Sequence, residues 1–270
     1  MNGPLLLYWS AGQQERNFGD ALVEFYCQRL LAPPASQDRD VYFLIGSTLD
    51  DAWLRRGLAA ARRRGGAVRS WTCGWRGTPV DPELLAQVEI TAVRGPLTRA
   101  ALALRPDLPL GDSALLLPLL HRPPRTAVRH GCLLVPHFSD PQREAMLARP
   151  QDWGADAAAS PVIRSVADIL AVIDAIARAR LVLCGAMHAA VVALAFGVSF
   201  AFFRDGFLDC PDKWADLAAS IGRPEEFAAR RSEAGAITNR VDRSPPLRPL
   251  LDACPLPVRP AVLRRAAALA

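Results

Sequence analysis

The chain of 270 residues is 51% hydrophobic and carries a formal net charge of +5, which suits one large α/β domain or two smaller ones. Its basic residues are nearly all arginine, since Lys213 is the single lysine, and they are scattered apart from a run at residues 62–64. That pattern argues against a nucleic-acid-binding protein. No stretch approaches the roughly 18 consecutive apolar residues of a membrane helix, so we expect no transmembrane segment.

Short apolar strands alternate with amphipathic helices along the first part of the chain. Strands are expected at residues 5–9, 41–46, 67–72 and 90–93, and helices at residues 20–31, 53–64 and 98–104. The arginines at residues 62–64 fall at a helix end before two glycines, where positive charge complements the helix dipole. This alternation predicts a parallel sheet with helices on both faces.

A polar segment with paired prolines, residues 121–126, is the best candidate linker. A second alternating set follows, with strands expected at residues 132–136, 181–183 and 199–203 and helices at 166–179 and 188–196. We therefore predict an α/β protein of two Rossmann-like halves with mostly parallel sheets and a cleft between them. The predicted domains are residues 1–122 and 123–244. Residues 245–270 form a tail whose helix, at residues 261–269, packs back on the domains.

Charged side chains are expected at two adjacent strand ends. Arg94 ends an apolar run and Arg99 lies in the first turn of the next helix, while Asp112 follows the neighbouring strand. Ligands of open α/β sheets bind at the carboxyl ends of strands, and guanidinium groups suit phosphates and carboxylates. We therefore expect Arg94 and Arg99 to bind an anionic substrate. Asp112 is a candidate substrate contact that orients an acceptor hydroxyl or acts as a general base, or it only holds Arg94 or Arg99 in place. The alternative is that the arginines only form salt bridges with Glu89 or Asp112.

Two further groups of residues are candidates for the same site. Asn17, Gly19 and Asp20 open the first long helix, where Asp20 is a candidate catalytic carboxylate and Asn17 and Gly19 are candidate substrate contacts. Either Asn17 or Asp20 could instead be a simple helix cap. His188 begins a helix of small residues and is a candidate catalytic group, with helix capping as the alternative. His137 ends a strand and is a candidate substrate contact or a surface histidine.

Trp9, Trp71 and Trp75 lie near strand ends, where each could stack on a sugar or belong to the core. The sequence contains no nucleophile elbow, phosphate-binding loop or complete dinucleotide fingerprint, and no His/Cys cluster with metal-ligand spacing. We expect no metal and no bound cofactor. The six cysteines are well separated and the N-terminus lacks the basic region of a signal peptide, so a cytoplasmic protein is expected.

The chain resembles the polysaccharide pyruvyltransferases in six short pieces that occur in family order. The pieces span residues 17–22, 45–49, 92–99, 111–118, 135–138 and 187–188. They extend from residue 17 to residue 188 of the chain.

The resemblance implies a glycosyltransferase-B-like architecture and transfer of the pyruvyl group of phosphoenolpyruvate to a saccharide as a ketal. Phosphoenolpyruvate would be the donor substrate, with no cofactor. Arg94 and Arg99 would hold this donor, His188 would help bind phosphate and act as acid, and Asp20 would face the acceptor. A lipid-linked acceptor would bring the protein to a membrane surface.

One feature departs from the family, because Cys184, Gly185 and Ala186 stand where members carry serines before the histidine. This departure keeps open a non-catalytic relative that serves as a binding partner. A glycosyltransferase of the same shape that uses a nucleotide sugar is the other alternative. Neither the acceptor nor the choice between a ketal and an enolpyruvyl product follows from the sequence.

Overall fold

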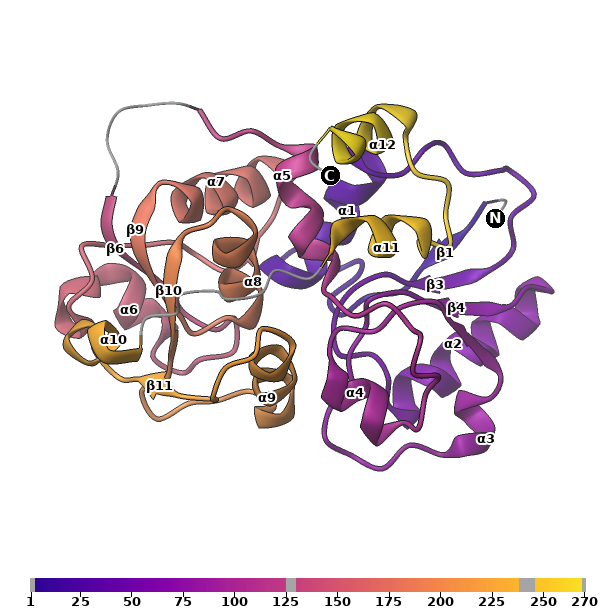
Figure 1. Ribbon diagram of the computed structural model, residues 1–270, viewed down its shortest axis with the longest axis horizontal. Coiled ribbons are helices and arrows are strands. Elements are labelled where there is room, and N and C mark those ends of the chain that lie inside the picture. The colour runs from indigo at the N-terminus through magenta and orange to yellow at the C-terminus, as the bar shows by residue number, and fades with distance from the viewer. Residues whose placement is uncertain (1–2, 125–129, 238–245, 269–270) are drawn as a thin grey trace.

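The computed structural model describes residues 3–124, 130–237 and 246–268. Two parallel β-sheets stand side by side, each flanked by helices (Figure 1). This arrangement confirms the predicted α/β class with mostly parallel sheets. Residues 125–126 of the predicted linker, the predicted boundary at residue 244 and the last residue of the helix expected at 261–269 lie outside the described residues. Among the described helices, none is long and apolar enough to cross a membrane.

The first sheet has the order β1-β3-β4-β5 with every pair parallel. Isolated bridges continue it at its carboxyl edge, from Cys73 to Val93 and from Val93 to Leu110. Its elements are β1 (Leu5–Leu6), β3 (Val41–Phe43), α2 (Asp51–Arg64), β4 (Val68–Ser70), α3 (Pro82–Leu85), β5 (Val88–Ile90), α4 (Pro96–Ala101), the 3-10 helix η1 (Ser113–Leu116) and α5 (Leu117–Leu120).

The second sheet has the order β11-β10-β9-β6-β7, again with parallel pairs. Its elements are β6 (His130–Val135), α6 (Arg143–Ala148), the 3-10 helix η2 (Pro150–Trp153), β7 (Ala157–Ala158), α7 (Val166–Ala177), β9 (Ala179–Cys184), α8 (Met187–Ala195), β10 (Ser199–Phe203), α9 (Pro211–Ser220), β11 (Phe227–Ala228) and α10 (Arg231–Ile237).

Local sequence explains where the long helices begin and end. Asp50 caps α2 by accepting the amide of Trp53, and Gly65 ends it at a φ of 68°, in the left-handed region that glycine adopts readily. Ser165 and Asp168 form a capping box at α7. The arginines of residues 62–64 occupy the last turn of α2, as the dipole argument expects.

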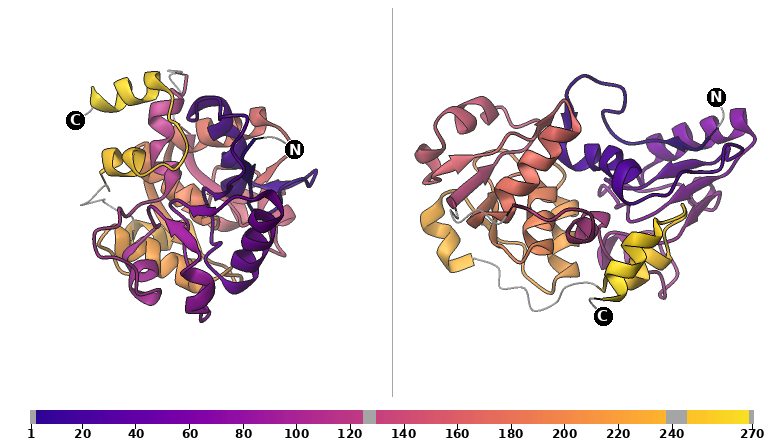
Figure 2. Two further views of the ribbon diagram at one scale, coloured as in Figure 1. Left: turned by 90° about the vertical axis from the view of Figure 1, so that its right-hand side faces the viewer. Right: turned by 90° about the horizontal axis from the view of Figure 1, so that it is seen from above.

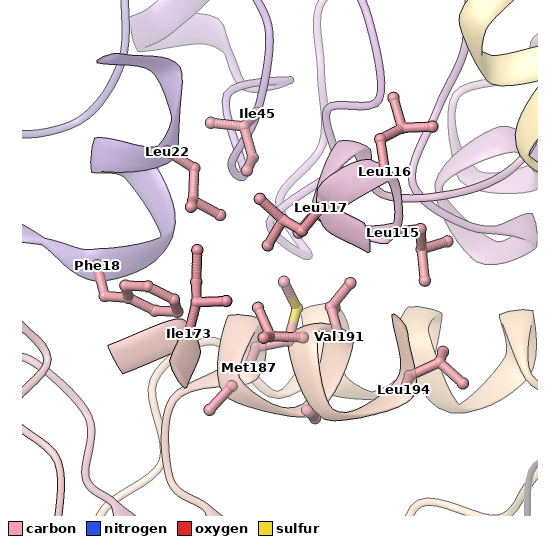
Figure 3. Packing of buried hydrophobic residues seen from close by; sticks show 14 of the residues in the cluster. Phe18, Leu22, Ile45, Leu115, Leu116, Leu117, Ile173, Met187, Val191 and Leu194 are labelled. Atoms are coloured by element: carbon pink, nitrogen blue, oxygen red, sulfur yellow. The ribbon is translucent and has the colours of Figure 1, made fainter. Parts of the chain in front are cut away.

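A continuous apolar core joins the two sheets. The helix α1 (Phe18–Arg29) contributes Phe18 and Leu22, and these lie near Ile173 of α7 and Met187 of α8 (Figure 3). Two short strands, β2 (Arg16–Asn17) and β8 (Val162–Ile163), pair antiparallel beside this core. They connect the two parts of the chain, the first of which forms the first sheet and the second of which forms the second sheet. The two parts are therefore joined by buried apolar contacts as well as by the linker.

The C-terminal tail packs on the first part of the chain, with α12 (Pro260–Ala267) against α5 and α11 (Leu247–Asp252) against η1 (Figure 2). The indole of Trp71 donates a hydrogen bond to the carbonyl of Leu250 at 2.9 Å. The amide of Arg259 donates to the carbonyl of Leu30. Trp71 is fully buried by this contact and cannot reach a substrate.

Candidate functional site

A pocket opens where the carboxyl ends of both sheets face each other. Its empty volume is about 730 Å³, part of it open to solvent. Residues that follow β1, β3, β4, β6, β9 and β10 line it together with the start of α1, α2, α8 and α9: Trp9, Asn17, Asp20, Gly46, Ser47, Thr48, Trp53, Arg76, His137, Ser139, Ala186, Met187, His188, Asp209 and Lys213.

His188 lies between the two parts of the chain at the second residue of α8. Its Nε2 is 3.4 Å from Oδ2 of Asp112, which follows the first sheet and is fully buried. Burial works against ionisation of Asp112, but the attraction of His188 and the hydrogen bond from the amide of Ala114 hold the pKa of that carboxyl below its usual range. Asp112 therefore stays an anion and fixes the imidazole of His188 in the wall of the pocket.

Gly19 gives the His188 ring its space. A Cβ atom at this position would stand 1.8 Å from Nδ1 and 2.4 Å from Cγ of the ring. Glycine is therefore required at position 19 because the backbone of α1 lies directly against the imidazole. Gly19 is not among the residues that line the pocket but packs on the imidazole, and its predicted role as a substrate contact stays a prediction.

The N-terminus of α8 faces the pocket without a side-chain cap. Ala186 at the cap position offers no side-chain acceptor, whereas Asn17, Asp50 and Ser165 cap α1, α2 and α7. The first amides of a helix have no partner within the helix, and an anion is stabilised there by the helix dipole. Ala186, Met187 and His188 all line the pocket. The amide of Ala186 donates to the carbonyl of Val135, so the amides of Met187 and His188 are the ones that suit a phosphate.

Asp20 is a buried carboxyl group inside the pocket, with 6% of the residue exposed. Burial raises the pKa of Asp20 to about 6, against the lowering effects of His188, Lys213 and Arg76. Gly46, whose φ is 95°, packs on it so closely that a Cβ there would lie 2.8 Å from Oδ1. Asp20 is thus a carboxyl that changes protonation near neutral pH, which general acid–base chemistry requires.

Asp209 connects a histidine and a lysine on the opposite wall. Nε2 of His137 lies 3.4 Å from Oδ2 of Asp209, and the same oxygen pairs with Nζ of Lys213. Nδ1 of His137 accepts the amide of Ser139, so the ring proton sits on Nε2 and points to Asp209. The hydrogen bond from His137 and the charge of Lys213 hold the pKa of Asp209 well below its usual value, although burial opposes them.

Two cations therefore reach the pocket, Lys213 and Arg76. Lys213 is 8% exposed, and its burial lowers its pKa while Asp209 acts to raise it. Arg76 is more open and lies 3.9 Å from carboxylate oxygens of both Asp50 and Asp209. Neither of these long contacts occupies the guanidinium fully, so Arg76 can turn to an anionic ligand.

Arg94 lies behind the pocket wall instead of lining it. Its guanidinium is 1% exposed and donates to Oδ2 of Asp216 at 3.3 Å, to Oγ of Ser47 at 2.8 Å and to the carbonyl of Trp75 at 3.3 Å. Ser47 does line the pocket. Arg94 is therefore placed to position Ser47 and to bind the two parts of the chain together, and three of its five donors are already used.

Arg99 is turned away from the pocket. Its Nη1 donates to the carbonyl of Pro106 at 2.6 Å, which ties α4 to the loop that follows it. Of the residues predicted from the sequence, the structure brings Asn17, Asp20, His137 and His188 together in one pocket, with Asp112 behind His188. Arg94 and Arg99 do not line this pocket. The sequence patterns did not indicate Arg76 or Lys213, although Lys213 is distinctive as the only lysine of the chain.

The fold and the pocket define an α/β protein with an anion-suited site that also holds a titratable carboxyl and a histidine. Within the described residues, no group of His, Cys, Asp and Glu side chains has the geometry of a metal site. No protein-family model, no curated protein and no solved structure matches the chain.

Proposed function

We propose that the chain is a phosphoenolpyruvate-dependent pyruvyltransferase that forms a pyruvate ketal on a saccharide. The observation that carries the proposal is one pocket that combines two cations, an uncapped helix N-terminus and two groups suited to proton transfer, Asp20 and His188. The six family-like pieces of the sequence support the same reaction. In this proposal the two sheets are Rossmann-like halves in a glycosyltransferase-B-like arrangement, and the pocket is the cleft between them.

The donor carries a phosphate and a carboxylate, and both need neutralising charge. The phosphate is assigned to the amides at the start of α8 beside His188, and the carboxylate to Lys213 and Arg76. Preorganised donors of this kind stabilise charge without rearrangement during the reaction. Backbone amides here would take the place of the family's serine hydroxyls, so the loss of those serines does not remove the phosphate site.

The reaction needs a proton on carbon and the removal of protons from two acceptor hydroxyls. Protonation of the methylene carbon makes a cationic centre at C2, and the first hydroxyl adds there and loses its proton. The bond from C2 to the phosphate oxygen then breaks, and the second hydroxyl closes the ketal. The two hydroxyl protons end on the new methyl group and on the phosphate, so the step balances without an oxidant or a metal. Asp20 and His188 are the groups assigned to these transfers.

Calorimetric titration with phosphoenolpyruvate tests the donor site. We expect micromolar to sub-millimolar affinity for the unmodified protein and at least tenfold weaker binding for Lys213→Met and for Arg76→Ala. Each substitution removes one positive charge that contacts the donor, and a factor of ten in affinity corresponds to about 1.4 kcal/mol of binding free energy. Arg99→Ala is the matched control, since this side chain bonds the Pro106 carbonyl outside the pocket. Its affinity should stay within twofold.

Two other results of that titration would replace the proposal. Binding of a nucleotide sugar such as uridine diphosphate glucose, with none of phosphoenolpyruvate, would establish a glycosyltransferase of similar shape. Folded protein that binds neither compound would identify a non-catalytic relative.

Donor binding should also depend on pH through Asp20. With a pKa of about 6, the carboxyl is mostly ionised at pH 7, and a bound trianion beside it favours its protonated form. Binding should therefore take up a proton, and affinity should fall as pH rises from 6 to 8, by up to about tenfold per unit.

Calorimetry in buffers of different ionisation enthalpy measures this proton uptake. The donor's own phosphate titrates in the same range, so the informative quantity is the difference from Asp20→Asn, which keeps the shape of the side chain and cannot ionise. Equal proton uptake by the two proteins would show that Asp20 is not the coupled group.

A further inference from the structure

Trp9 stands at the mouth of the pocket with 40% of its surface exposed, and the only other large apolar residue so exposed in the described part of the chain is Leu97. It follows β1 and belongs to the pocket lining. The other two candidate stacking residues are differently placed. Trp71 is fully buried, and the indole of Trp75 donates to the carbonyl of Thr78. Of these three indoles, Trp9 is therefore the one that lines the pocket and is exposed.

The indole is held by an aromatic contact across the pocket mouth. Its ring centroid lies 5.9 Å from that of Phe138, with the two planes at 81°. Phe138 follows β6 in the second part of the chain, and the guanidinium of Arg143 covers its ring at 5.5 Å. The edge-on contact fixes Trp9 without stacking the two flat faces on each other. A rigid aromatic surface is therefore offered at the entrance.

Polar groups surround this surface on the inner side. The side chains of Asn17 and Ser139 line the same pocket, and Asp20 lies deeper. A pyranose ring has one face of C–H groups and a rim of hydroxyls, so it matches an apolar surface next to amide and hydroxyl partners. A simple anion such as the donor gains nothing from the indole.

We propose that Trp9 is the platform of an acceptor subsite, on which a neutral pyranose ring packs its C–H face while a pair of its hydroxyls points inward to Asp20. This inference rests on the proposed function, because it identifies the second substrate of the same pocket as a saccharide.

Fluorine NMR of protein labelled with 5-fluorotryptophan tests the subsite. The Trp9 resonance is assigned by its absence in Trp9→Phe, and the resonance of buried Trp71 is the internal reference. With phosphoenolpyruvate saturating, methyl glucoside, methyl galactoside and methyl mannoside are titrated. We expect at least one glycoside to shift the Trp9 resonance saturably and leave that of Trp71 unchanged. Trp9→Ala should bind that glycoside at least tenfold more weakly, measured by saturation-transfer NMR.

The donor affinity of Trp9→Ala is measured by calorimetry in parallel and should stay within twofold of the unmodified protein. Intact donor binding with no Trp9 response to any glycoside would overturn the acceptor subsite and leave the donor site standing. Loss of donor binding by the unmodified protein would overturn the proposed function instead. A Trp9 shift produced by uridine diphosphate alone would assign the indole to a nucleotide and also overturn the subsite.

Discussion

Replacing Asp216 with alanine should lower the free energy of unfolding by about 3–5 kcal/mol, the usual cost of removing one partner of a buried ion pair. One oxygen of Asp216 accepts the amides of Leu97 and Thr98 at 2.9 and 3.0 Å, and the other accepts the Thr98 hydroxyl at 2.6 Å and Nε of Arg94 at 3.3 Å. The carboxylate, which comes from α9, thus caps α4 in the other part of the chain. Alanine would leave a buried guanidinium without its counter-charge.

Chemical denaturation followed by circular dichroism measures this effect. Asp252→Ala is the matched control, since Asp252 forms an exposed pair with Arg248 within α11, and exposed pairs contribute about 0.5 kcal/mol or less. Asp216→Asn should fall between the two, because the amide keeps one acceptor oxygen but loses the charge. A loss below about 1 kcal/mol for Asp216→Ala would show that the buried pair does not hold the two parts together.

The same substitution should weaken the donor site indirectly. Arg94 donates to Ser47, a pocket residue, and to Asp216 at once, so loss of Asp216 frees the guanidinium that fixes Ser47. Arg94 is in this sense a positioning residue. The prediction that Arg94 follows an apolar run at the end of a strand is correct, because Val93 bridges the neighbouring strands. Asp216, the partner that holds the guanidinium away from the pocket, is 122 residues away in the sequence.

Local patterns explain why much of the fold was predictable. Hydrophobic patterns place α2, α7, α8 and β10 within a few residues of expectation, because these patterns lie within the segment itself. The expected strand at residues 90–93 is β5 at Val88–Ile90 followed by two isolated bridges at Val93. The two-residue strands β2 and β8 are too short to carry a periodic signal, and each pairs with a strand that is far away in the sequence.

The residues of the candidate site likewise fall into those that a local sequence pattern indicates and those that it does not. Asp20 and His188 stand at helix starts after short turns, where sequence alone suggests a ligand site at a strand edge. Lys213 lies in the first turn of α9 and reaches the pocket only because the loop after β10 turns back beside Arg76. No local pattern predicts that return. Sequence patterns therefore indicate site residues at strand ends, and they do not indicate site residues that a loop brings in from a distant part of the chain.

Gly19→Ala should abolish most donor binding, with at least a hundredfold loss of affinity and about 1–3 kcal/mol less stability, the range of overpacked cores. The added methyl group would stand 1.8 Å from Nδ1 of His188, so either the imidazole leaves its contact with Asp112 or α1 shifts away from α8. Alanine is otherwise favourable in a helix by about 1 kcal/mol over glycine. The loss of stability and of donor affinity would therefore come from the clash with the His188 ring.

Gly235→Ala provides the matched control, because this helical glycine of α10 has nothing within 4 Å of its added Cβ. It should leave donor affinity unchanged and keep or slightly raise stability. A double-mutant cycle then separates steric from general damage. In Gly19→Ala combined with His188→Ala the clashing ring is gone, so the two stability losses should be less than additive by more than about 0.5 kcal/mol. Additive losses of stability would mean that the methyl group disturbs α1 itself. The packing of α1 on His188 would then no longer explain why position 19 is a glycine.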